Sequence, residues 1–172
     1  GGVVYSLNWI PLGAFVRILG EDDPKEPNSF ASKSLFSRFV VGWALSASNN
    51  RHLTVKALDM ALQRRGPTRE LLHHSDQGST YASEDYQSAL DARGITCSMS
   101  RRGNCLDNAA MESWNSTLKS ELGEDFDSAG DAKAKLFDYI EVFYNQARMH
   151  SSLDYQSPGE FERNAAALKA AA

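Results

Sequence analysis

Short apolar runs alternate with helix-like segments between residues 39 and 122, and this order constrains the fold more than any other feature. The run "FSRFVVGWALS" is rich in β-branched and aromatic residues, which predicts a strand over Phe39 to Ala47. Two further strands are expected in "RELLHHS" and "ITCSM". Strands that alternate with helices indicate an α/β layer architecture.

Helices are expected between and after these strands, each with its own start and stop signals. Thr54 is a candidate N-cap for a helix that Gly66 and Pro67 end. Ser83 should cap the next helix and Gly94 should close it. The inward side chains predicted for these two helices are Val55, Leu58, Ala61, Leu62, Tyr86, Ala89 and Leu90.

Two more helices are expected in the second half of the chain. Asn108 can cap a helix with an apolar stripe at helical spacing: Met111, Trp114, Leu118 and Leu122. A helix over about 129–148 should turn these residues inward: Ala132, Leu136, Tyr139, Ile140 and Phe143. An alanine-rich helix should follow near the end of the chain.

Composition narrows the class of protein. A chain of 172 residues with 42% apolar residues can bury the core of one domain. A net charge of −4 does not indicate a nucleic-acid binder with a broad basic surface, so any DNA contact should be local. Without a signal peptide or a run of about 18 apolar residues, we expect a soluble, cytoplasmic protein with reduced thiols and no membrane contact.

Two acidic residues stand out by their context. Asp76 follows a predicted strand in "HHSDQGSTY", and Glu112 lies on the polar face of a predicted helix, with thirty-five residues between them. Alone, Asp76 reads as a turn residue and Glu112 as a solvated side chain. Converging carboxylates would instead suit metal-assisted phosphoryl transfer, because Mg²⁺ prefers oxygen ligands and two metals can clamp the attacking and leaving oxygens.

Several other polar residues have two readings. His73 and His74, with Cys97 and Cys105, could be imagined as a zinc site, but adjacent histidines on a strand point to opposite faces and the spacing fits no compact finger. The Arg101-Arg102 pair could be a solvated loop. Arg148 and His150 could serve a helix C-terminus or lie near an active site, and both readings stay open.

Taken together, three ordered stretches carry a resemblance: "HSDQGSTY", "MSRRGNCLDNAAMESWNSTLKSEL" and "SSLDYQSPGEFE". They resemble the catalytic core of insertion-sequence transposases related to retroviral integrases, the acidic-triad (DDE) enzymes. The segments "SLFSRFVVGWALS" and "ALDMALQRRG" resemble what precedes that core. The likeness runs from Ser34 to about Glu162. It implies a ribonuclease-H-like mixed sheet flanked by helices.

The resemblance also implies roles for matching residues. Asp76 and Glu112 would be the second and third triad carboxylates and would hold Mg²⁺ or Mn²⁺. DNA contacts would come from four residues of the loop and helix around Glu112: Arg101, Arg102, Asn108 and Lys119. The implied partners are element ends and target DNA, with a homo-oligomer assembled on the DNA. The implied function is DNA nicking and strand transfer in transposition.

The first triad carboxylate is the point where the chain departs from the pattern. It should lie near position 16, where Val16 stands, and no Asp or Glu occurs in the first twenty residues. We therefore expect three parts: a divergent or frameshifted segment over 1–33 with its first strands degraded, a catalytic-core-like domain over 34–163, and an alanine-rich tail over 164–172. A missing ligand should impair activity.

Two other functions fit the same residues. The first is a non-catalytic DNA-binding remnant of a transposase, which the missing acid favours. The second is a different ribonuclease-H-like nuclease, which would hydrolyse DNA without strand transfer. Fold alone does not separate these functions.

Overall fold

The sheet of this protein consists, in the described residues, of two short parallel strands. One helix lies between the two strands in the sequence. The structure is a computed structural model that describes residues 38–47, 51–65, 71–99, 109–123 and 125–171. These residues fall into two compact units, one within 41–125 and one formed by 38–40 and 126–171. Each unit is described by itself.

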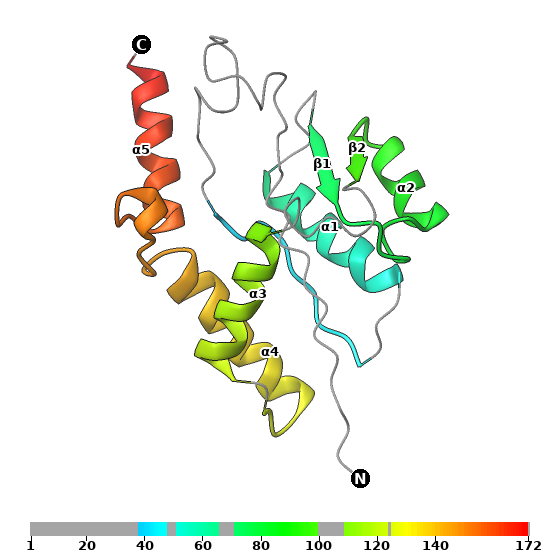
Figure 1. Ribbon diagram of the computed structural model, residues 1–172, viewed down its shortest axis with the longest axis horizontal. Coiled ribbons are helices and arrows are strands. Elements are labelled where there is room, and N and C mark those ends of the chain that lie inside the picture. The colour runs from blue at the N-terminus through cyan, green and yellow to red at the C-terminus, as the bar shows by residue number, and fades with distance from the viewer. Residues whose placement is uncertain (1–37, 48–50, 66–70, 100–108, 124, 172) are drawn as a thin grey trace. The chain divides into compact units, whose positions relative to one another are not determined.

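The sheet of the first unit pairs β1 (Leu72–Ser75) with β2 (Thr96–Met99) (Figure 1). The strands run parallel, with Leu72 opposite Thr96 and Ser75 opposite Met99. Parallel strands need a crossover, and α2 (Glu84–Asp91) supplies it. Both strand predictions and the α/β class are confirmed.

Helix α2 begins and ends where its sequence signals lie. The Ser83 side chain accepts a hydrogen bond from the Tyr86 backbone N–H at 3.4 Å, as an N-cap does. Gly94 adopts a positive φ of 65° after the last turn, where a residue without a Cβ is unstrained. Both predictions are confirmed.

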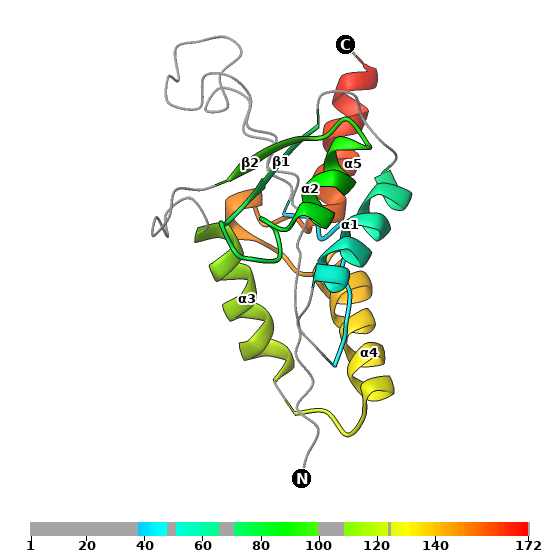
Figure 2. The same ribbon diagram turned by 90° about the vertical axis from the view of Figure 1, so that its right-hand side faces the viewer.

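Helix α1 (Arg51–Arg65) packs on α2, and α2 packs on β2. Figure 2 shows α2 between the sheet and α1. The core between these elements consists of Ala57, Leu58, Ala61, Tyr86, Leu90 and Ile95. One ion pair joins the helices, Arg51 to Asp85 at 2.7 Å, and a second joins Asp59 of α1 to Arg93 in the turn after α2, at 2.6 Å.

Two predictions about the start of this unit are wrong. Helix α1 begins three residues before Thr54, whose hydroxyl donates to the Arg51 carbonyl at 2.7 Å, so Thr54 lies inside the helix rather than at its cap. The segment 38–47 forms no strand. Its Val40 N–H donates to Asn145 Oδ1 at 2.9 Å, and its C=O accepts from Asn145 Nδ2 at 3.0 Å.

Helix α3 (Ala109–Leu122) completes the first unit, and its Trp114 and Leu118 are buried as predicted. The proposed cap Asn108 lies outside the described residues.

The regular elements described in the second unit are helices, apart from one antiparallel bridge between His150 and Gln156. Helix α4 (Ala129–Phe137) starts at the Ser128 N-cap and continues as the π-helical segment η3 (Asp138–Tyr144). A short 3₁₀ turn, η4 (Ser151–Leu153), leads to α5 (Pro158–Ala170), which Ser157 caps. The predicted start at 129 and the alanine-rich helix are confirmed.

The prediction for Phe143 is wrong, because its side chain is 45% exposed whereas Tyr144 is buried. The hydrogen bond from Asn145 N–H reaches the Ile140 carbonyl, five residues back rather than four. A π-helical turn holds one extra residue, so it advances the inward face from Phe143 to Tyr144.

Candidate active site around Asp76

Asp76 lies one residue beyond β1, where the chain leaves the sheet. The Gly78 N–H donates to Asp76 Oδ1 at 2.9 Å, and the half-buried side chain is thereby held over the start of its own loop. Among the described residues, no hydrogen bond to Asp76 Oδ2 occurs. One oxygen is thus fixed by the backbone and the other is open to a ligand.

A side chain at position 78 would displace the Asp76 carboxylate. A Cβ on Gly78 would lie 2.8 Å from Asp76 Oδ1, closer than real Cβ contacts come, and 3.5 Å from Tyr81 Cδ2. The Gly78 carbonyl accepts from the N–H groups of Tyr81 and Ala82, each at 3.0 Å. The glycine therefore ties the Asp76 side chain to the following turn.

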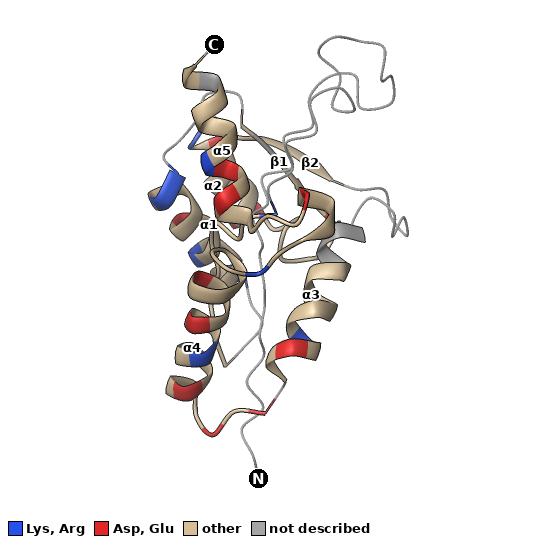
Figure 3. Cartoon of the chain, turned by 90° about the vertical axis from the view of Figure 1, so that its left-hand side faces the viewer, with Lys and Arg blue, Asp and Glu red and all other residues tan. Residues whose placement is uncertain are grey.

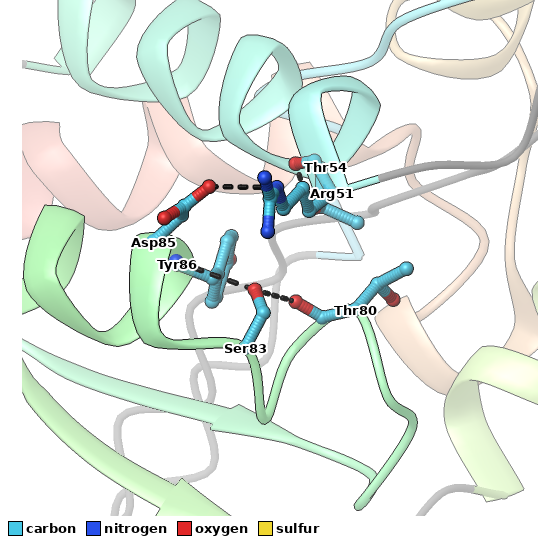
Figure 4. Close-up of polar contacts among 6 residues, drawn as sticks. All are labelled: Arg51, Thr54, Thr80, Ser83, Asp85 and Tyr86. Carbon is cyan, nitrogen blue, oxygen red and sulfur yellow. Dashed lines mark hydrogen bonds and ion pairs between the residues drawn. The ribbon is translucent and has the colours of Figure 1, made fainter.

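The loop after Asp76 is fastened to α2 (Figure 4). The Ser83 hydroxyl donates to the Thr80 carbonyl at 2.7 Å while it caps the helix. Gln87 Nε2 donates to the Tyr81 carbonyl at 2.7 Å and contacts Cys97 Sγ at 3.4 Å. Asp85, in the first turn of α2, pairs with Arg51 of α1 in the same view.

The two histidines of β1 point to opposite faces of the sheet, as the alternation of strand side chains requires. His73 is buried, and its Nε2 lies 3.0 Å from the Tyr86 hydroxyl. His74 Nδ1 lies 3.1 Å from Ser98 Oγ on the neighbouring strand. Burial, and then the nearby His74, lower the pKa of His73 to about 4, so the ring is neutral near pH 7.

Sequence reasoning missed the roles of the residues beneath Asp76. Tyr86 was expected inside the core, and a buried tyrosine hydroxyl needs a polar partner. That rule was the available signal, but only the fold identifies the partner as His73, thirteen residues earlier.

Glu112 lies in the first turn of α3, and its side chain is outside the described residues. The loop residues Arg101 and Arg102 also lie outside them. Lys119 is exposed in the last turn of α3, seven residues after Glu112 and so about two turns along the same side. The structure therefore describes the Asp76 side of the predicted site.

The donor chemistry around Asp76 fits a magnesium ligand, because the open atom is a carboxylate oxygen. Within the ranges that the structure describes, no three His, Cys, Asp or Glu side chains gather into a metal cluster. Of the two carboxylates predicted to hold a metal, Asp76 is thus the one whose side chain the structure describes.

Arg148 and His150 form a separate cluster in the second unit. Arg148 Nη1 lies 3.3 Å from His150 Nδ1, and both side chains contact the Tyr144 ring. The His150 N–H also donates to the Gln156 carbonyl at 3.1 Å, closing the loop that contains η4. This arrangement suits a structural role for Arg148 and His150. A position of these residues near the active site stays a prediction.

No helix in the described ranges is both long enough and apolar enough to cross a bilayer.

Similarity to solved structures supports the fold. A chain of the simian T-cell lymphotropic virus intasome, in complex with PP2A regulatory subunit B56 gamma, matches with a TM-score of 0.55. The match covers 69% of this chain and 42% of that chain, at 15% identity. This confirms the ribonuclease-H-like fold class.

Sequence relatives are insertion-sequence proteins. The chain is 46% identical over 131 residues to the transposase for insertion sequence element IS904 of Lactococcus lactis, covering 75% of this chain and 52% of the relative. It is 43% identical over 130 residues to the transposase InsF for insertion sequence IS3A of Escherichia coli, covering 74% of this chain and 45% of the relative. The chain thus spans about half the length of these curated relatives.

Two family descriptions, each named integrase core domain, match residues 26–105 and 93–158. The matches overlap and together span most of the chain, including Asp76 and Glu112. The protein therefore belongs to the integrase core domain family and resembles the insertion-sequence transposases within it.

Proposed function

We propose that this chain is the catalytic core of an insertion-sequence transposase, which nicks DNA at element ends and joins the 3′-hydroxyl to target DNA. The observation that carries the proposal is the geometry of Asp76: a carboxylate at the end of β1, with Oδ1 held by the Gly78 N–H and Oδ2 open. Membership of the integrase core domain family supports the reaction class.

In this proposal Asp76 and Glu112 would hold Mg²⁺ or Mn²⁺. A bound divalent ion would stabilise the charge that develops on the phosphate and activate the attacking oxygen. The role of Asp76 is to present one carboxylate oxygen at a fixed position, which the Gly78 N–H and the loop anchored on α2 provide. Arg101, Arg102 and Lys119 would contact DNA phosphates, and Asn108 would adjoin the DNA at the start of α3.

Strand transfer tests this function. The full chain is incubated with a labelled oligonucleotide that carries an element end and with target DNA, in Mg²⁺ or Mn²⁺. We expect slow product formation that Asp76→Asn abolishes, because the substitution replaces the proposed carboxylate ligand with an amide. Product that persists in Asp76→Asn contradicts the proposal, and robust product from the unaltered chain contradicts the expected impairment.

A second candidate is a non-catalytic DNA-binding remnant. The observation that favours it is the absence of any Asp or Glu from the first twenty residues, where the first triad acid was expected. It predicts DNA binding that neither Mg²⁺ nor Asp76→Asn changes, with no nicked product.

A further inference from the structure

Three aromatic side chains pack together at the Asp76 loop, and we call them the ring cluster: His73, Tyr81 and Tyr86. The rings of Tyr81 and Tyr86 meet edge to face, with centroids 5.5 Å apart and an interplanar angle of 84°. His73 packs against Tyr86 at 5.5 Å and against Tyr81 at 6.4 Å. His73 is 3% exposed and Tyr86 is fully buried.

The ring cluster joins three parts of the first unit. His73 belongs to β1, Tyr86 to α2, and Tyr81 to the loop that connects them. The 3.0 Å contact between the Tyr86 hydroxyl and His73 Nε2 fixes α2 to the strand. Within the described part of the chain His73 Nδ1 has no hydrogen-bond partner, so Tyr86 supplies the side chain's hydrogen bond there.

The cluster reaches Asp76 through Tyr81 and Gly78. Asp76 Oδ1 and Tyr81 Cδ2 both border the space that a Gly78 Cβ would occupy, at 2.8 and 3.5 Å. Burial, and then the Asp76 charge, raise the pKa of the Tyr81 phenol, so this hydroxyl stays protonated and within electrostatic range of the carboxylate. The Tyr81 carbonyl is in turn fixed by Gln87 of α2.

We propose that the ring cluster positions the Asp76 carboxylate for a divalent cation, with His73, Tyr81 and Tyr86 as positioning residues. A metal ligand on a loop is held to its productive geometry only by neighbours that are themselves locked in place. The Asp76 loop has such neighbours in His73 of β1 and Tyr86 of α2, whose rings pack against Tyr81 of the loop. The inference rests on the proposed function, since it takes Asp76 as a metal ligand.

The test measures metal binding in the absence of DNA. Mn²⁺ is titrated into the full chain and its variants by calorimetry, and paramagnetic broadening of the Gly78 amide signal reports binding at Asp76. The variants are Tyr86→Phe, which removes one hydroxyl, His73→Leu, and the double variant. Tyr139→Phe is the matched control, because it alters a buried tyrosine of the second unit. Circular dichroism establishes that each variant is folded at the temperature used.

We expect Tyr86→Phe and His73→Leu each to weaken Mn²⁺ binding roughly tenfold, the scale seen when supports of a metal ligand are removed. The double variant should be no weaker than either single one, because both break the same contact. His73→Gln, which keeps a hydrogen-bonding group, should recover part of the affinity. Tyr139→Phe should bind as the unaltered chain does.

Each outcome has one meaning. Mn²⁺ binding that is lost in Asp76→Asn but unchanged in Tyr86→Phe and His73→Leu overturns the positioning role and leaves the proposed function intact. Binding that does not depend on Asp76 overturns the proposed metal site, and the positioning role with it. If Tyr86→Phe does not fold, Tyr81→Leu, which removes the packed ring, takes its place, and an unchanged affinity there overturns the inference.

Discussion

At the scale of single residues, two buried polar side chains in the described units depend on partners far away in sequence. His73 bonds Tyr86 across the first unit, and Asn145 bonds Val40 across 105 positions in the second. On folding, each of these two side chains exchanges its hydrogen bonds to water for one or two hydrogen bonds within the protein. Removal of the partner therefore costs free energy, because the polar side chain stays buried.

Protonation of His73 should destabilise the fold in acid. Its folded pKa of about 4 lies below the unfolded value of 6.5, so the unfolded chain binds the extra proton between these values and stability falls as the pH drops. From pH 7 to pH 5 the loss is about 2 kcal/mol. Urea unfolding of the unaltered chain and of His73→Gln at both pH values measures it. If the difference in unfolding free energy between the two proteins does not change with pH, His73 is not the group responsible for the loss of stability.

Asn145→Ala should destabilise the second unit strongly. The fully buried Asn145 side chain accepts from the Val40 N–H at 2.9 Å and donates to the Val40 carbonyl at 3.0 Å. Truncation removes both of these buried hydrogen bonds, at a cost of roughly 3 kcal/mol. Asn164→Ala is the control, because its exposed bond to Gln156 should contribute less than about 0.5 kcal/mol. Equal urea midpoints for Asn145→Ala and the unaltered chain would contradict this prediction and show that other groups replace the Asn145 side chain.

At the scale of elements, the segment after Val40 lies directly against α1. A Cβ on Gly42 would lie 2.3 Å from the Ala57 carbonyl oxygen and 2.8 Å from the Ala61 nitrogen. Both atoms belong to the helix backbone, which cannot yield as a side chain can. The glycine therefore sets how closely this segment approaches the helix.

Gly42→Ala should separate the segment from α1 and cost about 3 kcal/mol, as overpacking against backbone does. Gly130→Ala is the matched control. The nearest atom to its new methyl group would be Ser128 Oγ at 3.7 Å, and alanine is the better helix former, so a gain of about 0.5 kcal/mol is expected. Thermal unfolding followed by circular dichroism compares the two. Effects of the same sign would refute the close packing of Gly42.

At the scale of the whole molecule, a net charge of −4 means that the proposed DNA binding would have to come from local groups of cations. The proposed phosphate contacts are Arg101, Arg102 and Lys119. A second basic pair, Arg64 and Arg65, lies at the end of α1, where positive charge also favours the helix dipole (Figure 3). The two pairs carry the same charge, so they can be compared directly.

Three phosphate contacts predict that the logarithm of the DNA association constant falls with the logarithm of salt concentration with a slope of about −3. Arg101→Ala with Arg102→Ala should reduce that slope to about −1, whereas Arg64→Ala with Arg65→Ala should leave it near −3. Fluorescence anisotropy with a labelled duplex across a salt series measures both. The reverse ranking would assign the contacts to α1 instead.

The sequence by itself determined the features that local rules govern. The Ser83 cap, the Gly94 stop and the strands around His73 and Cys97 follow from spacing and residue type within a few positions. Its ordered motifs also singled out Asp76 as the acid at the end of β1. The integrase core resemblance is confirmed by the family matches that span 26–158.

Only the tertiary structure decided the features that depend on distant partners. The strand-like segment 39–47 forms no strand, and the backbone of its Val40 bonds the side chain of Asn145, 105 positions away. The inward face of η3 moves from Phe143 to Tyr144, because a π-helical turn breaks the 3.6-residue period. The ring cluster behind Asp76 likewise has no local signature, since its hydrogen bond joins β1 to α2 and exists only once both elements have packed together.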